Sequence, residues 1–280
     1  MQQQHQKPLA NTHMLNKSLS IISLIIGVGT GINVMAADFS VETNRTTASR
    51  GFGKIDHMTV SGSKKITENI NLQGRLETKT QSATATSGKK SGKFIEGISS
   101  YQLTPEFYGM TRIGFTDEKT LFVDRSIYQE FGYKYGKIGP AFTDLNVGLG
   151  TRKFPAGTEF FLNIGPTLSW ASGALWLRRE QSLDNGGFRH VLSISQWASE
   201  KVKFDASLIS ERRKKYTLPV AGSGLASDVA VERYLLGVTY KMTEATDLAV
   251  KIEKISLEKS GVAGKYYDPT SFGIGLNVKY

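Results

Sequence analysis

The last eleven residues of the chain, Thr270-Ser-Phe-Gly-Ile-Gly-Leu-Asn-Val-Lys-Tyr280, decide the fold that the sequence predicts. Large apolar side chains occupy one parity of this stretch, and small or polar residues occupy the other; the apolar set is Phe272, Ile274, Leu276, Val278 and Tyr280. A period of two predicts a β-strand with one apolar face. A transmembrane β-barrel closes on such a strand, because its last strand pairs with its first and leaves no open edge in lipid.

The N-terminal 36 residues have the pattern of a secretory signal peptide. Lys17 precedes an apolar stretch that is too short to span a membrane, and small residues follow up to Ala36. We expect cleavage after Ala36, so that residues 1–36 are the signal peptide and residues 37–280 are the barrel domain. Residues 1–13 look dispensable, and Met14 is an alternative start. An amphipathic N-terminal helix is the other interpretation of this segment.

Composition restricts the classes to which the mature chain can belong. The chain has no cysteine, so no disulfide can form in the oxidising periplasm. After residue 36 no apolar run is long enough for a transmembrane helix, so a membrane-embedded form must be a barrel, in which alternate residues meet lipid. A soluble periplasmic β-domain is the alternative. The formal charge is +10, and removal of the two lysines within residues 1–36 leaves +8.

Alternating segments recur through residues 37–280, separated in turn by tight turns and by longer loops rich in Gly, Ser and Lys. The pattern predicts an all-β fold: a transmembrane antiparallel up-and-down β-barrel of 14 strands, with six short turns and seven longer loops. Twelve strands is the alternative if residues 38–46 and 174–181 are not strands. Aromatic residues near the short-turn ends are typical of an interfacial girdle; they are Tyr101, Phe107, Tyr135, Trp170, Tyr240 and Tyr280.

Charged side chains occupy the second parity of the expected strands, and we expect them to face the lumen because charge on the lipid face is unfavourable. This parity carries twelve basic and eight acidic residues, which predicts a hydrated pore whose field favours anions. Most should pair across strands, leaving Arg75, Arg112, Arg178, Arg213 and Arg233 free to meet a solute. The candidate pore-lining residues are Arg75, Arg112, Arg152, Arg178, Arg213, Arg233, Lys134 and Lys241.

Enzymatic functions find little support in the sequence. His57 and His190 are the histidines of the mature chain, and neither belongs to a recognisable Ser/His/acid constellation. The sequence has no metal-binding cluster, Gly-rich phosphate loop or cysteine motif, so we expect no metal, no cofactor and no catalysis. Basic clusters at Lys89-Lys90 and Arg212-Arg-Lys-Lys215 suit lipopolysaccharide phosphates or an acidic solute, or are simply solvated loops. Nucleic acid is not an expected partner.

The terminal pattern of Gly275, Val278 and Tyr280 resembles the C-terminal assembly signal of bacterial outer-membrane proteins. With the signal peptide, the hairpin rhythm and the basic interior, it makes the chain similar to the Gram-negative monomeric outer-membrane porins. Size and strand number resemble the porin G type, and the Arg- and Lys-lined interior resembles the oligogalacturonate-specific, KdgM-like type.

The resemblance implies a passive diffusion channel in the outer membrane for small hydrophilic solutes, with anions or acidic saccharides preferred. It also implies folding by the barrel assembly machinery, outer-membrane lipid and lipopolysaccharide as surroundings, and a monomer. The first alternative is a non-channel barrel that acts as an adhesin or a structural protein. The second is a barrel phospholipase or protease.

Overall fold

The computed structural model describes residues 38–47, 54–83, 88–118, 121–154, 157–216, 227–259 and 265–279. The expected signal peptide, residues 1–36, and the terminal Tyr280 lie outside this part of the chain. The strands are β1 (Asp38–Thr47), β2 (Lys54–Thr67), β3 (Ile70–Gln81), β4 (Lys90–Gln102), β5 (Phe107–Thr116), β6 (Arg125–Ile138), β7 (Ala141–Phe154), β8 (Gly157–Trp170), β9 (Gly173–Ser182), β10 (Phe188–Trp197), β11 (Val202–Tyr216), β12 (Ser227–Lys241), β13 (Thr246–Lys259), β14 (Lys265–Tyr267) and β15 (Thr270–Lys279).

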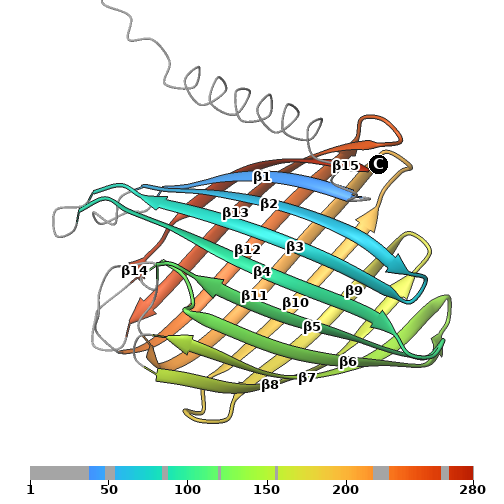
Figure 1. The fold of residues 1–280 in the computed structure, drawn as a ribbon, viewed down its shortest axis with the longest axis horizontal. Helices are drawn as coiled ribbons and strands as arrows, with labels where there is room; N and C mark the ends of the chain where they lie inside the picture. The colour runs from blue at the N-terminus through green and yellow to red at the C-terminus, as the bar shows by residue number, and fades with distance from the viewer. Residues whose placement is uncertain are drawn as a thin grey trace, which may run out of the picture. The chain divides into compact units, whose positions relative to one another are not determined.

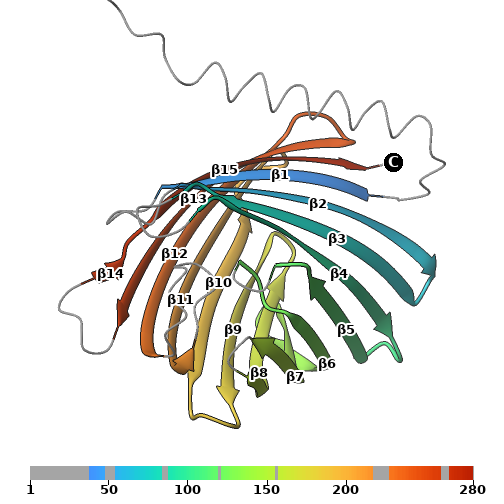
Figure 2. The same ribbon diagram turned by 60° about the vertical axis from the view of Figure 1, so that its left-hand side comes forward.

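Strand pairing closes the sheet into a barrel. Each strand from β1 to β13 pairs antiparallel with the next, and β15 pairs with both β13 and β1. Within the described residues, 14 strands (β1 to β13 and β15) therefore form a ring, and the three-residue β14 lies beside β13. Figure 1 shows β1 next to β15, and Figure 2 shows the curvature of the wall. The expected 14 strands are confirmed, and the two segments that allowed twelve are β1 and β9.

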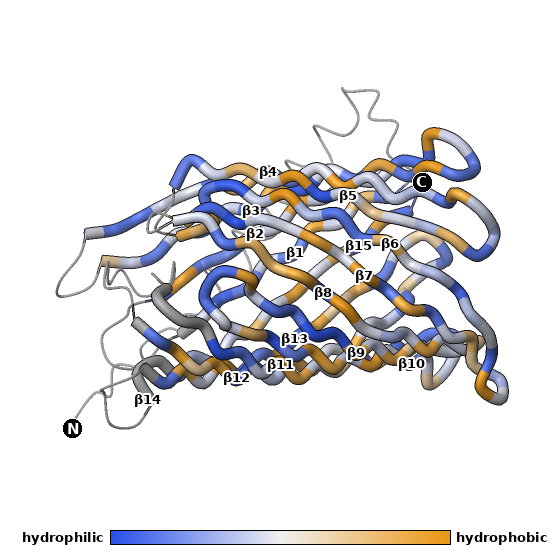
Figure 3. Tube along the Cα trace, turned by 90° about the horizontal axis from the view of Figure 1, so that it is seen from below, coloured by the Kyte–Doolittle hydropathy of each residue, from blue (hydrophilic) through white to orange (hydrophobic). Residues whose placement is uncertain are grey.

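The closing strand takes the register that its alternation requires. Ser40 of β1 is opposite Asn277 of β15, and Val41 is opposite Leu276, so in this part of the pairing polar residues meet polar residues and apolar residues meet apolar ones. Ser271 is 1% exposed on the inner side, whereas Phe272 is 50% exposed on the outer side. The same alternation runs along the other strands (Figure 3). A slip of one residue would reverse the two faces.

The outer face carries a belt of exposed apolar side chains. Examples from three parts of the wall are Ile95 on β4, Leu149 on β7 and Leu236 on β12, each more than half exposed. Soluble monomers rarely expose continuous apolar surface of this kind, so the belt contacts lipid. This excludes the soluble β-domain. None of the described residues form a helix long and apolar enough to cross a membrane.

Six connections at one rim are short turns, as the sequence predicts. The turn after β6 needs two residues and places Gly139 at a φ of 58°, where glycine is favoured. Longer connections lie at the opposite rim, with one exception. Phe154 is paired with Gly157, so the connection between β7 and β8 has two residues. The expectation of seven longer loops is wrong at this position because both strands continue beyond their predicted ends.

Candidate functional site: the charged lumen

The polar parity of the strands forms the inner wall, and an ion pair across the closing strand shows how it is built. Lys251 of β13 reaches Glu42 of β1, with 2.5 Å between Nζ and Oε2. The two residues lie opposite Gly273 and Gly275 of the intervening β15. Because these glycines have no side chains, the lysine can pass over β15. The pair therefore joins both neighbours of the last strand on the lumen side.

A second cluster joins β2, β3 and β4. Arg75 Nη2 lies 2.7 Å from Glu77 Oε1, and Arg75 Nη1 lies 3.6 Å from Glu96 Oε2. His57 Nε2 is 3.0 Å from the other oxygen of Glu77. Both carboxylates are buried, and a buried carboxylate needs a paired cation or hydrogen-bond donors. Arg75 is thus held between two acids.

A third cluster centres on Arg152 of β7. Its two terminal nitrogens each lie 2.6 Å from an oxygen of Glu180 on β9, which is the bidentate geometry that guanidinium and carboxylate favour. Arg152 Nη1 is also 3.7 Å from Glu159, and the guanidinium carbon lies 4.0 Å from the centre of the Phe161 ring. The arginine therefore crosses β8 above an aromatic ring and links three strands.

Tyrosine side chains lie flat against the wall between β5 and β8. A Cβ atom added at Gly132 would lie 2.2 Å from the Tyr108 ring, and one at Gly148 would lie 2.4 Å from the Tyr128 hydroxyl oxygen. Each tyrosine therefore covers a glycine on the next strand. The Tyr108 hydroxyl donates to Asp144 at 2.9 Å, and the Tyr128 hydroxyl is 2.5 Å from Glu130. Tyr128 also stacks on Phe161, with ring centres 5.7 Å apart.

The connection between β5 and β6 folds onto the inner wall. Leu121 and Phe122 are 3% and 5% exposed. Phe122 stacks on Phe94 of β4 with ring centres 5.7 Å apart, and Lys79 Nζ of β3 lies 4.3 Å from the centre of the Phe122 ring. Because Phe94 and Lys79 belong to the lumen parity, the loop narrows the lumen on the β3–β4 side.

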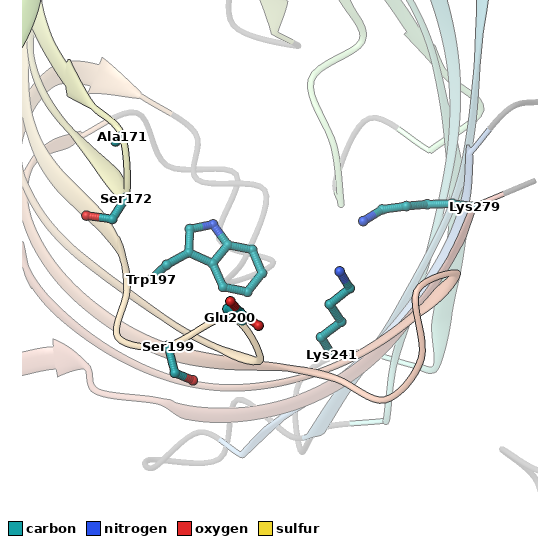
Figure 4. A pocket seen from close by; sticks show the side chains of 7 residues that line it. All are labelled: Ala171, Ser172, Trp197, Ser199, Glu200, Lys241 and Lys279. Carbon is teal, nitrogen blue, oxygen red and sulfur yellow. The ribbon is translucent and has the colours of Figure 1, made fainter.

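The short-turn rim opens into a hollow of about 630 Å³. Trp197, Lys241 and Lys279 point into it, and polar residues from two neighbouring turns complete it (Figure 4). Lys279 Nζ is 3.4 Å from Asp247 Oδ2. Lys241 has no acid within ion-pair distance among the described residues. This mouth therefore carries two lysines, the carboxylate of Glu200 and an exposed aromatic ring.

The candidate residues differ in how they are held. Arg75, Arg152 and Arg233 are ion-paired, the last to Glu253 at 3.2 Å. Arg178 donates to the carbonyl oxygens of residues 165 and 166 at 3.0 and 2.9 Å, so the wall itself binds its guanidinium. Arg112 contacts Met110 Sδ at 3.4 Å and has no acid within 4 Å in the described part of the chain.

Two of the other three candidates lie at or near the short-turn rim. Lys134 donates to the Pro105 carbonyl at 3.1 Å, and Lys241 lines the mouth. Arg213 lies on β11, and its side chain is outside the described structure. The expectation that Arg75 and Arg233 are free is therefore wrong, because carboxylates on the same or the next strand lie within reach of both. Among the described side chains of the five arginines expected to be free, that of Arg112 has neither an acid nor a backbone carbonyl as its partner.

Sequence reasoning missed several lumen residues. Glu42, Glu159 and Asp247 also face inward, so the excess of basic over acidic residues is smaller than predicted. Arg189 also faces inward and lies 3.8 Å from Glu211. Its strand begins at Phe188, two residues before the predicted start. The flat tyrosines had a signal in the sequence, since glycines recur on the polar parity of β6 and β7 beside strands with tyrosine.

The two histidines lie on opposite faces. His57 faces the lumen, where its Nε2 lies 3.0 Å from an oxygen of Glu77. His190 belongs to the outer face, where its ring is 5.0 Å from that of Phe188. Within the described residues, no group of three His, Cys, Asp or Glu side chains is placed to hold a metal ion.

Fold and site together define the class of this protein: a transmembrane antiparallel β-barrel of the outer membrane, with a charged inner wall. No protein-family model matches the chain, and no curated protein matches it. Among solved structures, it is similar to the KdgM porin, with 9% identity, a TM-score of 0.44, and coverage of 86% of this chain and 99% of that one.

Two further structures from Pseudomonas aeruginosa are also similar to this chain. OprD has 9% identity and a TM-score of 0.46, with 88% of this chain and 93% of that chain covered. OccD3 (OpdP) has 7% identity and a TM-score of 0.49, with 89% and 92% covered. At 7–9% identity, the similarity to these three structures is one of fold.

Proposed function

We propose that this chain is an outer-membrane porin, a passive diffusion channel for small hydrophilic solutes. The observation that supports this most strongly is an inner wall that is both charged and accessible. The side chains of Arg75, Arg233 and Lys251 remain 36%, 40% and 36% exposed although each is ion-paired. Eight-stranded barrels fill their interior with side chains, whereas 14 strands enclose a wider space.

A preference for anions follows from the cations that lack acidic partners. Lys79, Arg112 and Arg178 have no carboxylate within 4 Å in the described lumen. Two inward carboxylates, those of Glu130 and Asp144, accept hydrogen bonds from tyrosines rather than from cations. The surplus is modest, and the net charge of +8 that remains after removal of residues 1–36 adds a field that attracts anions to the channel.

Acidic saccharides fit one part of the wall in particular. Arg112 is directly opposite Tyr128 on the next strand, and Tyr128 stacks on Phe161. A guanidinium binds a carboxylate through two parallel hydrogen bonds, and an aromatic face suits the apolar side of a sugar ring. A uronate lying on this surface would engage both groups. Arg112 and Tyr128 are therefore the residues that we expect to contact the solute.

Swelling of liposomes that contain the refolded chain tests the proposal. We expect swelling in neutral monosaccharides and faster swelling in galacturonate than in galactose of the same concentration. The matched control is Arg179→Gln, which removes one positive charge from the outer face, and it should leave both rates unchanged. No swelling from a barrel shown to be folded by its heat-modifiable gel mobility would refute the channel.

A non-channel barrel is the second candidate, and the inward loop favours it. Leu121 and Phe122 occupy lumen space, and ion pairs cross several strands of the wall. A plugged barrel of this kind would serve as an adhesin or a structural protein and would pass no sugar. The swelling assay separates these two functions directly.

We propose that residues 1–36 are removed on export, that Gly275, Val278 and Tyr280 direct assembly by the barrel assembly machinery, and that the barrel is a monomer. N-terminal sequencing of the membrane-bound form tests the first. Deletion of Tyr280, followed by measurement of the amount of folded barrel in outer membranes, tests the second. Sedimentation of the detergent-solubilised barrel tests the third.

A further inference from the structure

The outer face of the barrel differs at its two ends. Near the short turns it carries exposed aromatic residues such as Tyr135 and Tyr240. Near the longer loops, the apolar belt ends in exposed cations on β6, β7, β9 and β11, which are Arg125, Lys153, Arg179 and Arg212. An outer surface that carries aromatic rings at one end and these cations at the other suits a membrane whose two leaflets differ in charge.

Two of these cations are direct neighbours. Arg125 of β6 and Lys153 of β7 are paired across the two strands, and both side chains are exposed. They share the outer parity with Ile127 and Leu149, which are 54% and 58% exposed to lipid. Directly opposite residues have Cα atoms about 5 Å apart, so the two charged groups can reach one small ligand.

No carboxylate neutralises this pair in the described part of the chain. Neither residue has an acid within ion-pair distance, in contrast to the outer-face pairs Arg45–Asp56 at 2.6 Å and Lys254–Asp268 at 2.9 Å. Two acids of the neighbouring connections, Asp117 and Asp184, each accept a hydrogen bond from a backbone N–H, that of Lys93 at 2.6 Å and that of Phe160 at 2.5 Å.

Two like charges directly opposite each other destabilise a sheet unless an anion lies between them. The ligand that fits must carry a dense negative charge and must also tolerate the apolar surface below it. Phe115 on β5 and Phe160 on β8 are 53% and 49% exposed beside the pair. An anionic head with acyl chains satisfies both conditions, because its chains cover these rings while its head meets the cations.

We propose that Arg125 and Lys153 bind a phosphate of lipid A, the acylated and phosphorylated anchor of lipopolysaccharide in the outer leaflet. The inference rests on the proposed outer-membrane location, with the longer loops facing outward. Lipid A carries its phosphates at the level where its acyl chains begin, which is the level at which this pair ends the apolar belt. Arg179 and Arg212 extend the basic edge around the barrel toward further lipid molecules.

Native mass spectrometry of the full chain in detergent tests this proposal with bisphosphorylated lipid A as the probe. The double variant Arg125→Gln/Lys153→Gln should bind lipid A about 30-fold more weakly, since each cation near an anionic surface contributes a factor of about five. The matched control is Arg45→Gln/Lys254→Gln, which removes the same charge from the same face but from cations that already have acidic partners. Its affinity should change much less.

Three outcomes would overturn the inference: equal losses in the two double variants, equal affinity for dephosphorylated lipid A, or equal affinity for phosphatidylglycerol. The last would show a general attraction to anionic lipid. Gel mobility establishes that each variant is folded. Channel conductance is recorded on the same samples and should not change, because both residues face outward. A barrel that binds lipid A through this pair and does not conduct would keep this inference and refute the porin.

Discussion

Replacing Arg112 with glutamine should weaken the preference of the channel for anions more than neutralising an ion-paired arginine of the inner wall. Arg112 lies on β5 opposite Tyr128, and its guanidinium contacts Met110 at 3.4 Å with no acid within 4 Å in the described lumen. Other inward arginines, such as Arg75 and Arg152, share their charge with carboxylates. Removing one of those would free an acid and disturb the wall as well.

The expected magnitude follows from Coulomb attraction in a hydrated pore. Two unit charges about 4 Å apart attract each other by about 1 kcal/mol in water, and a screening length of about 10 Å at 0.1 M salt leaves about two-thirds of this. An anion in contact with Arg112 thus loses about 0.7 kcal/mol in the variant, which is about threefold in its binding constant. Arg112→Glu reverses the sign and should double the free-energy change.

The assay is single-channel recording with galacturonate added at increasing concentration. We expect the blocking constant to rise about threefold in Arg112→Gln and about tenfold in Arg112→Glu. Arg179→Gln removes the same charge from the outer face and should have no effect. A wild-type blocking constant in the Arg112 variants, or an equal shift in Arg179→Gln, would refute this role of Arg112.

Three further substitutions have defined outcomes. Arg152→Ala should destabilise the barrel by about 3–5 kcal/mol in urea titrations, because the carboxylates of Glu159 and Glu180 lose their cation. The added change Glu180→Gln should recover part of the lost stability. Gly148→Ala should lower single-channel conductance, because its methyl group would push the Tyr128 ring into the lumen; the double variant with Tyr128→Ala should restore conductance. Phe122→Ala should raise conductance by releasing the loop from the β3–β4 wall, and an unchanged value would show that this loop does not narrow the path.

The fold could be predicted from the sequence because each strand repeats one physical constraint. Lipid outside and water inside impose a period of two, and the terminal stretch from Thr270 shows it in full. Strand ends were harder to place. β7 continues to Phe154, and β8 already begins at Gly157. Both ends lie beyond the apolar belt, where the alternation of apolar and polar residues in the sequence no longer indicates which side chains are buried. The two-residue connection between them was therefore predicted as a longer loop.

The sequence predicted which side chains face the lumen, but it did not predict which of them form ion pairs. The inward orientation of a residue such as Arg75 follows from its position on the strand. Its ion-pair partners, in contrast, are Glu77 on the same strand and Glu96 on the next. Which acid lies within reach depends on the register between strands, and the sequence does not state that register. The same limitation hid the flat tyrosines and the inward loop, because both depend on contacts between neighbouring strands.

Single-channel recording of the refolded chain in a planar bilayer under a KCl gradient tests the central claim most directly. We predict stable conductance with a reversal potential shifted toward that of chloride. A reversal potential shifted toward that of potassium would keep the channel but contradict the role given to Arg112. A folded, heat-modifiable barrel that shows no conductance would contradict the porin itself.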